Sequence, residues 1–249
     1  MTATRFLVER KNIRPPFAWL EGGEHHHLGK VLRGKPGRLV WLMDETGQTY
    51  RAEVVDVDAA RIRLRILDEE PPARRDRVTI TLAQALLKAK KMDLVVQKAT
   101  ELGADIFIPV ITERSIVRIE GGGEHKAERW RRIAREAAKQ SRRSLAPEVL
   151  APLRFRDFLA RGAANRKLIL TENEGRVLRE IILSGAGEAA LGGSPTVLLV
   201  VGPEGGWTGE EEAESRAAGF EAASLGTQPL RSETAALAAL AIISHFWKA

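Results

Sequence analysis

Two loops in the last third of the chain carry residue types that could build a ligand site. Residues 202–206 read GPEGG and directly follow an apolar run, and residues 225–234 read LGTQPLRSET about one helix later. Glycines let a backbone approach a ligand closely and leave its N–H and C=O groups accessible. Arg231 and Glu233 add charged side chains that a turn does not need. The pair of loops therefore favours a binding site.

The elements around the first loop are predicted by local pattern. Residues 196–201 are β-branched or leucine without a charged interruption, which predicts a buried strand. Thr208 and Glu211 have the spacing of a capping box, so a helix should begin just after the loop. A strand, a glycine loop and a helix form ligand sites at the carboxyl ends of strands in α/β folds. An ordinary rigid connection would explain the first loop taken alone.

The wider pattern predicts two domains, 1–72 and 73–249. The second should be an α/β domain with a largely parallel, helix-covered sheet, because predicted strands and helices alternate along it. Its predicted strands are 78–82, 106–111, 167–171, 196–201 and 220–224, and its predicted helices are 92–102, 124–144, 177–183, 210–218 and 234–247. The first should be a small β-barrel, with strands at 38–43, 49–57 and 61–67.

Composition excludes several classes of protein. The 249 residues are 44% hydrophobic and 29% charged, as in ordinary globular proteins. No cysteine is present, which excludes disulfides, thiolate metal sites and thiol nucleophiles. No apolar run approaches the roughly 20 residues of a membrane span, and charge interrupts the first ten residues too early for a signal peptide. We expect a cytoplasmic protein without a membrane partner.

Positive charge is concentrated in the middle of the chain. Residues 73–166 hold 21 basic and 11 acidic side chains, against 12 and 11 in residues 1–72 and 6 and 11 in residues 167–249. This distribution predicts a surface that binds a polyanion such as RNA. A solvated helical surface, with arginine favoured by genome composition, would look similar. Aromatic residues are only 5%, which argues against base stacking on a sheet.

Two other motifs are weak. Residues 185–190 read GAGEAA and match a dinucleotide-binding pattern, but they follow a predicted helix and precede a strand, so a surface linker is the better interpretation and a nicotinamide enzyme is disfavoured. Residues 25–27 are three consecutive histidines. Adjacent imidazoles cannot easily turn to one ion, so no metal site is expected.

The two glycine-bearing loops resemble the paired motifs of the 16S rRNA uridine-N3 methyltransferase (RsmE) family of the SPOUT superfamily. Further similarity runs over nearly the whole chain. It includes HLGKVLR at 27–33, KM at 91–92, QKATELG at 97–103, ER at 113–114 and the segment 136–143. Gln228 and Pro229 depart from the family pattern, which more often has a basic and an aliphatic residue there.

The resemblance implies a fold and a reaction. The second domain would be a SPOUT-type domain whose loops form a deep trefoil knot and bind S-adenosylmethionine, and the first a PUA-like barrel that docks RNA. The implied reaction methylates N3 of a uridine in 16S rRNA of the small ribosomal subunit, by a homodimer. The helix 234–247 could pack against the partner or lie in the core. Two alternatives stay open: a SPOUT enzyme acting on a ribose 2′-hydroxyl, and a non-catalytic rRNA-binding assembly protein.

Site residues follow from the resemblance and from the chemistry. Uridine N3 must lose a proton while negative charge grows on the flanking carbonyl oxygens. A carboxylate or solvent could take the proton, and an arginine would stabilise the negative charge. We predict Arg231, Glu204 and Glu172 as catalytic. The predicted cofactor-binding residues are Leu170, Thr171, Glu172, Val201, Gly202, Pro203, Glu204, Gly205, Gly206, Leu225, Gly226, Leu230, Ser232, Glu233 and Thr234. The predicted RNA-binding residues are Arg5, His27, Arg33, Lys91, Arg114, Arg131, Arg132, Gln140, Arg142 and Arg143. Glu204 and Glu233 could instead brace the helices that begin beside them.

Overall fold

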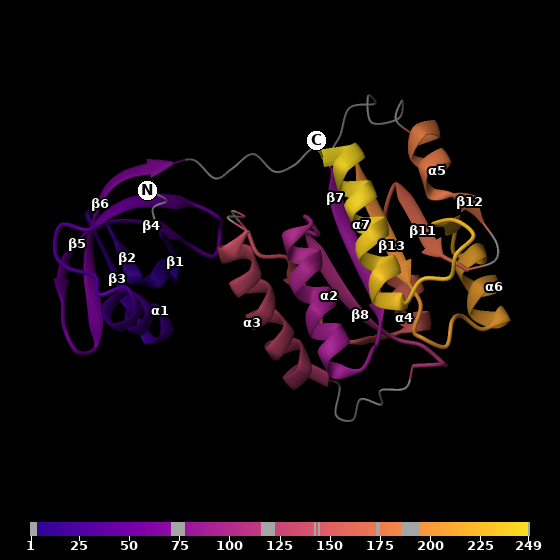
Figure 1. Cartoon of the computed structure of the whole chain (residues 1–249), viewed down its shortest axis with the longest axis horizontal. Coiled ribbons are helices and arrows are strands. Elements are labelled where there is room, and N and C mark those ends of the chain that lie inside the picture. Colours follow the sequence, from indigo (N-terminus) through magenta and orange to yellow (C-terminus); the bar gives the residue numbers. More distant parts are fainter. Residues whose placement is uncertain are drawn as a thin grey trace. The chain divides into compact units, whose positions relative to one another are not determined.

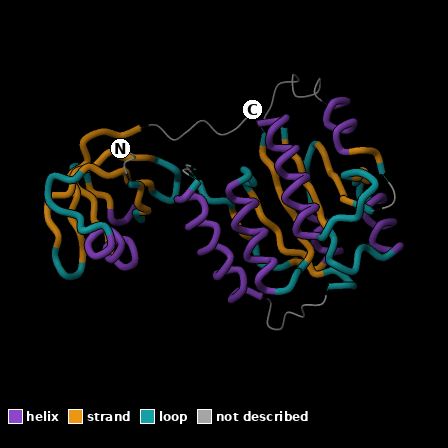
Figure 2. Tube along the Cα trace, in the orientation of Figure 1, coloured by secondary structure: helices purple, strands orange, loops and turns teal. Residues whose placement is uncertain are grey.

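The computed structural model describes residues 4–70, 78–115, 123–141, 143, 145–172, 175–185 and 195–248. The chain divides into two compact units, residues 1–74 with 138–145, and residues 75–137 with 146–249 (Figures 1 and 2). The predicted boundary between residues 72 and 73 falls in 71–77, outside the described residues. A docking role for the first unit stays a prediction.

The N-terminal unit contains a curled six-stranded sheet with the order β1-β4-β5-β6-β3-β2. Its strands are β1 (Arg5–Leu7), β2 (Ile13–Arg14), β3 (Phe17–Glu21), β4 (Leu39–Met43), β5 (Thr49–Val57) and β6 (Arg61–Glu70). Three helical segments join them: η1 (Arg10–Asn12), α1 (Gly22–His26) and the π-helical turn η2 (His27–Val31). The three predicted strands are confirmed. Strands β1 and β2 were missed because they have only three and two residues, and β3 was also not predicted.

The C-terminal unit contains a sheet with the order β10-β8-β7-β13-β11-β14-β12, and β9 pairs with β8. Every pairing described in it is parallel. The strands are β7 (Thr79–Ala85), β8 (Ile106–Ile111), β9 (Glu148–Val149), β10 (Leu153–Arg154), β11 (Arg166–Leu170), β12 (Arg176–Val177), β13 (Thr196–Val201) and β14 (Glu221–Ser224). The helices are α2 (Ala89–Glu101), α3 (Glu124–Gln140), α4 (Phe155–Arg161), α5 (Leu178–Gly185), α6 (Gly209–Ala217) and α7 (Ser232–Lys248). The predicted parallel, helix-covered sheet is confirmed.

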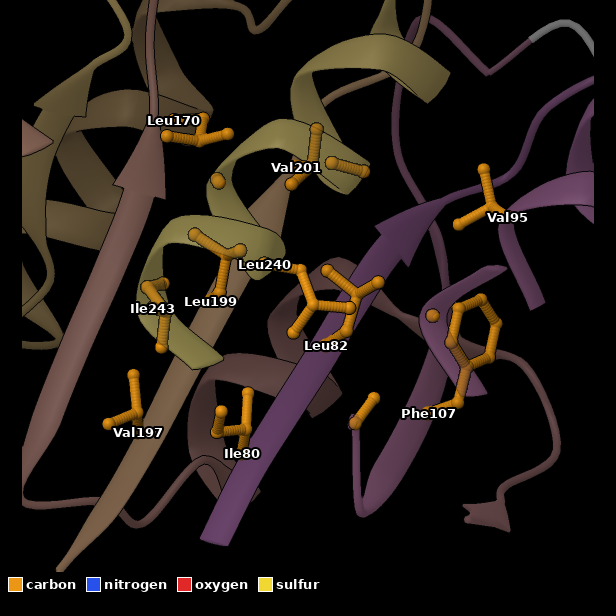
Figure 3. Packing of buried hydrophobic residues seen from close by; sticks show 14 of the residues in the cluster. Ile80, Leu82, Val95, Phe107, Leu170, Val197, Leu199, Val201, Leu240 and Ile243 are labelled. Carbon is orange, nitrogen blue, oxygen red and sulfur yellow. The ribbon is translucent and has the colours of Figure 1, made fainter. Parts of the chain in front are cut away.

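Strand β13 shows why its sequence is continuously apolar. Leu199 and Val201 belong to the core that α2 and α7 cover (Figure 3). Leu198 and Val200 belong to a second core on the other face, with Phe155 of α4. Because successive side chains of a strand point to opposite faces, a sheet covered on both sides needs apolar residues at every position. Helix α7 is a core helix on one face, where Ala236, Ala239, Leu240 and Ile243 are buried.

Three details differ from the sequence expectations. Helix α3 ends at Gln140, four residues earlier than predicted. Lys139, a basic residue that the solvated helical surface considered above would expose, is buried: its Nζ lies 2.6 Å from Glu24 Oε1 and over the ring of Phe6. A buried ammonium is tolerated because a carboxylate compensates it. Helix α5 runs to Gly185, the first residue of the predicted linker 185–190, and the other residues of that linker lie outside the described residues.

Within the described part of the chain, none of the helices has the length and apolar character needed to cross a membrane.

Candidate active site

A cavity of about 640 Å³ lies at the carboxyl ends of β11 and β13 in the C-terminal unit. The two glycine-bearing loops form most of its wall. Its lining residues are Arg114, Leu170, Thr171, Glu172, Val201, Gly202, Pro203, Glu204, Gly205, Gly206, Trp207, Glu212, Leu225, Gly226, Gln228, Pro229, Leu230, Arg231, Ser232 and Ala235. This is the edge of a parallel sheet where α/β folds place ligands.

Trp207 shapes the first loop. Its indole Nε1 donates a hydrogen bond to the Leu170 carbonyl oxygen at 2.7 Å, and its ring packs against Gly202. A Cβ on Gly202 would lie 3.1 Å from Trp207 Cε2, so a larger residue would have to displace the ring. Gly206 has φ +69, a conformation that glycine adopts without strain. The glycines therefore allow a close, specific backbone path around the cavity.

Arg114 supports the same loop from the segment after β8. Its Nη1 donates hydrogen bonds to the carbonyl oxygens of Gly205 and Trp207, both at 3.0 Å. The segment is itself held by Glu211 of α6, whose Oε1 accepts from the backbone N–H of Glu113 at 2.9 Å. The predicted capping box with Thr208 is present at this helix start. Arg114, predicted to bind RNA, thus has a bracing role at the cavity.

A buried hydrogen-bond network joins the two loops. The Ser232 hydroxyl, at the start of α7, donates to the carbonyl oxygen of Gly202. Gln84, fully buried in β7, donates from Nε2 to Ser232 Oγ at 3.0 Å. Sequence reasoning missed Gln84, although an amide in a strand of apolar residues and threonines is a signal, since a buried amide needs partners.

Lys91 of α2 forms ion pairs with both loops. Its Nζ lies 3.1 Å from Glu204 Oε1 and 3.2 Å from Glu233 Oε2. The hydrogen bond to the Glu204 carboxylate, followed by that to Glu233, raises the pKa of Lys91 above its ordinary value. Lys91 therefore stays charged at neutral pH, and the side chain that we predicted to bind RNA is engaged within the protein.

Other charged groups at the cavity are free to meet a ligand. Arg231 and Glu172 are exposed, and neither side chain has a hydrogen-bond or ion-pair partner within the described ranges. Glu212 of α6 is half-buried at the wall and is likewise without a described partner. The site thus combines one unpaired guanidinium, unpaired carboxylates and open glycine backbone, which suits a polar ligand with several kinds of hydrogen-bonding group.

The structure places most predicted site residues together. Arg231, Glu204, Glu172 and every predicted cofactor-binding residue except Glu233 and Thr234 line the cavity. Glu233 is buried behind it, against Lys91, and Thr234 is exposed on α7. Sequence reasoning missed Trp207, Glu212 and Ala235, whose side chains reach the wall from helix starts or from the loop end. The chemical role of each residue stays a prediction.

The predicted RNA-binding residues are more scattered. Arg5, His27 and Arg33 belong to the N-terminal unit, where His27 contacts Phe6 edge-on and Arg33 is exposed. Along α3 and just beyond it, Arg131 donates from Nε to Val149 O at 2.9 Å, Arg132 and Gln140 are exposed, Arg143 is half-buried, and Arg142 lies outside the described residues. None of these lines the cavity, and their contact with RNA stays a prediction. Among the described residues, no cluster of three or more histidine or acidic side chains suits a metal ion.

Comparison with known proteins assigns the family. Residues 74–244 match the model of an RNA methyltransferase domain. Residues 20–67 match that of an RNA methyltransferase PUA domain. The chain belongs to the RNA methyltransferase family defined by these domains. Membership confirms the prediction made from the two loops and from the motifs spread along the chain.

Individual relatives are similar to this chain over most of their length. A relative from Synechocystis named ribosomal RNA small subunit methyltransferase E is 34% identical, covering 97% of this chain and 77% of the relative. A Bacillus subtilis protein of the same name is 32% identical, and the match covers 96% of this chain and 94% of that protein. A crystal structure of ribosomal RNA small subunit methyltransferase E from Neisseria gonorrhoeae, bound to S-adenosyl methionine, superposes with a TM-score of 0.85. Its sequence is 33% identical to this one, and the match covers 99% of this chain and 98% of that chain. The solved structure therefore shares the fold of this chain over nearly the whole length of both.

Proposed function

We propose that this RNA methyltransferase transfers the methyl group of S-adenosylmethionine to N3 of a uridine in 16S rRNA of the small ribosomal subunit. The observation that carries the proposal is Arg231, which lines a cavity with glycine backbone in its wall and whose side chain has no partner among the described residues. The names of the relatives supply the substrate class. Because the proposed substrate is ribosomal RNA, the proposed location is the cytoplasm.

The cavity has the size and chemistry to hold the donor. Its volume of about 640 Å³ lies within the range of small-molecule sites. Leu170, Val201 and Leu225 offer apolar contact for an adenine ring, while the backbone of 202–206 offers N–H and C=O groups without side-chain bulk. When bound, S-adenosylmethionine supplies a methyl group that its sulfonium already activates, so this chain needs no nucleophile of its own.

The remaining task is to hold the acceptor base and to manage its charge. We assign to Arg231 the stabilisation of negative charge that grows on the uracil carbonyl oxygens when N3 loses its proton. Of the predicted carboxylates, Glu204 is paired with Lys91, whereas Glu172 is exposed without a described partner. Glu172 is therefore the better acceptor for the N3 proton. Placing donor and acceptor in line would supply most of the rate enhancement.

The knot, the homodimer and the docking role of the PUA-like unit remain part of this proposal. In a homodimer, exposed apolar side chains such as Phe246 of α7 and Leu94 of α2 would be covered; they are 50% and 41% exposed in the single chain. Light scattering of the purified protein gives the molar mass that distinguishes a dimer from a monomer.

The reaction is tested with donor labelled in its methyl group. The protein is incubated with small ribosomal subunits from a strain that lacks the modification, and the product is mapped by reverse transcription. We expect label in the RNA and a strong stop at one uridine, because N3 methylation blocks the base-pairing edge. Label without a stop would indicate a ribose 2′-hydroxyl acceptor. RNA binding without any label would indicate a non-catalytic protein.

A further inference from the structure

We propose that Lys91 is a positioning residue that clamps the two cavity loops together and so sets the affinity for the methyl donor. The inference rests on the proposed function, in which that donor is S-adenosylmethionine. It assigns Lys91 a role different from the RNA contact predicted from the sequence.

The clamp joins three elements that are distant in sequence. Lys91 lies on α2, Glu204 in the first loop, and Glu233 near the end of the second loop, in the first turn of α7. One ammonium lies 3.1 Å from Glu204 Oε1 and 3.2 Å from Glu233 Oε2. Together with the hydrogen bond from Ser232 to the Gly202 carbonyl, this ammonium therefore fixes the separation of the two loops.

Charge makes the contact important. Two carboxylates that share one ammonium lie close together and would repel each other without it. The Glu233 side chain is only 12% exposed, and its buried Oε2 lies 3.2 Å from Lys91 Nζ, so the Lys91 charge offsets this carboxylate. The amino end of α7 helps to stabilise this carboxylate but acts only at short range. Removing Lys91 would leave a largely buried anion without its partner, which is strongly unfavourable.

The same contacts make Lys91 a poor phosphate ligand. Its side chain is 30% exposed, and its ammonium already lies between two carboxylates. An RNA phosphate would have to displace at least one of them. Lys88 and Lys90 are exposed beside it and have no ion pair with any described residue, so they are better placed to contact RNA.

The clamp acts on the cavity through Glu204. This residue lines the cavity and is followed directly by Gly205 and Gly206, whose backbone forms the wall. If Glu204 moves away from Glu233, the glycine backbone moves with it, and the donor loses preformed contacts. Loss of Lys91 should thus weaken donor binding more than RNA binding.

The experiment compares Lys91→Met with Lys90→Met as the matched control on the same helix. Binding of S-adenosylmethionine is measured by calorimetry, and binding of 16S rRNA is measured over a range of salt concentrations. We expect K91M to raise the Kd for S-adenosylmethionine by about tenfold, because the ion pairs that it removes are partly buried. K90M should leave this Kd unchanged, and K91M should leave RNA affinity within about twofold of the wild type.

A second pair of variants, E233Q and K91M/E233Q, tests the clamp even if K91M alone does not fold. Glu233→Gln removes the buried anion, so K91M/E233Q should fold even where K91M does not. Because the contact with Glu204 remains in E233Q, adding K91M to it should weaken donor binding several-fold. Equal donor affinity of E233Q and K91M/E233Q would overturn the clamp.

Other outcomes separate this inference from the proposed function. If wild-type protein binds S-adenosylmethionine and K91M binds it equally well, the clamp is wrong while the proposed donor stands. If K91M instead loses RNA affinity with a shallower salt dependence, Lys91 contacts phosphate and the clamp is again overturned. If the wild type does not bind S-adenosylmethionine, the proposed donor is wrong and the clamp is rejected with it.

Discussion

The indole N–H of Trp207 donates to the carbonyl oxygen of Leu170 at 2.7 Å and ties the end of the glycine loop to the end of β11. Both residues are buried and both line the cavity. The bond connects two walls of the site that are 37 residues apart in sequence. Its loss should therefore affect both the stability of the C-terminal unit and the shape of the donor site.

Replacing Trp207 by phenylalanine tests that bond. Most of the ring packing is kept, but the Leu170 carbonyl loses its donor, which should cost about 1–3 kcal/mol of unfolding free energy. Urea unfolding measures this, and calorimetry should show weaker binding of S-adenosylmethionine. Trp19→Phe in the N-terminal unit is the control, because the Trp19 indole has no hydrogen bond to any described residue. Equal effects of the two changes would contradict the assigned role.

Two glycines near the first loop should respond differently to alanine. At Gly202 a Cβ would lie 3.1 Å from the Trp207 ring, so G202A should cost roughly 1–3 kcal/mol by overpacking and weaken donor binding. At Gly209, the first residue of α6, a Cβ would meet nothing within 4 Å, so G209A should be neutral or slightly stabilising. Thermal unfolding and donor titrations of both variants check this. A tolerated G202A would show that the ring can move freely.

Arg231→Ala should slow methyl transfer strongly without abolishing binding. If its guanidinium stabilises the deprotonated base, kcat should fall by a factor of roughly 10²–10³. The Kd values for S-adenosylmethionine and RNA should change little. Single-turnover transfer with labelled donor measures the chemical step. Arg179→Ala, on the exposed face of α5, controls for the loss of one positive charge. Transfer at a near-wild-type rate in R231A would remove Arg231 from the mechanism.

The ionisation of Tyr50 at high pH shows whether its side chain is buried in the folded N-terminal unit. Burial, with the negative charge of Asp44 as the next cause, raises the pKa of Tyr50 to about 12. An unfolded tyrosine ionises near pH 10. The contribution of the neutral, buried phenol of Tyr50 to the free energy of unfolding is therefore complete below about pH 10 and is lost as the pH rises through about 12. Tyr50 is the one tyrosine in the sequence. The ultraviolet absorbance of tyrosinate should therefore titrate near 12 in native protein and near 10 in denaturant. A native midpoint near 10 would contradict the buried environment.

Local patterns in the sequence were sufficient for much of the architecture. The alternating strands and helices of the C-terminal unit, the capping box of Thr208 and Glu211, and the two loops that form the cavity were all predicted. Each depends on residues close together in the chain, since periodicity and capping act within one or two turns. Helix α4 and the two- and three-residue strands were missed because they are too short to show a period.

Tertiary structure alone decided which side chains hold the site together. The sequence identified Lys91 and Arg114 only as basic residues of a family motif, and it marked neither Gln84 nor Trp207. Their partners lie on other elements: Gln84 meets Ser232 across 148 positions, and Arg114 meets Gly205 across 91. Such pairs depend on the order in which the strands assemble, and no local pattern encodes that order. The sequence thus determined the elements and the ligand-facing loops, and packing determined how those loops are held.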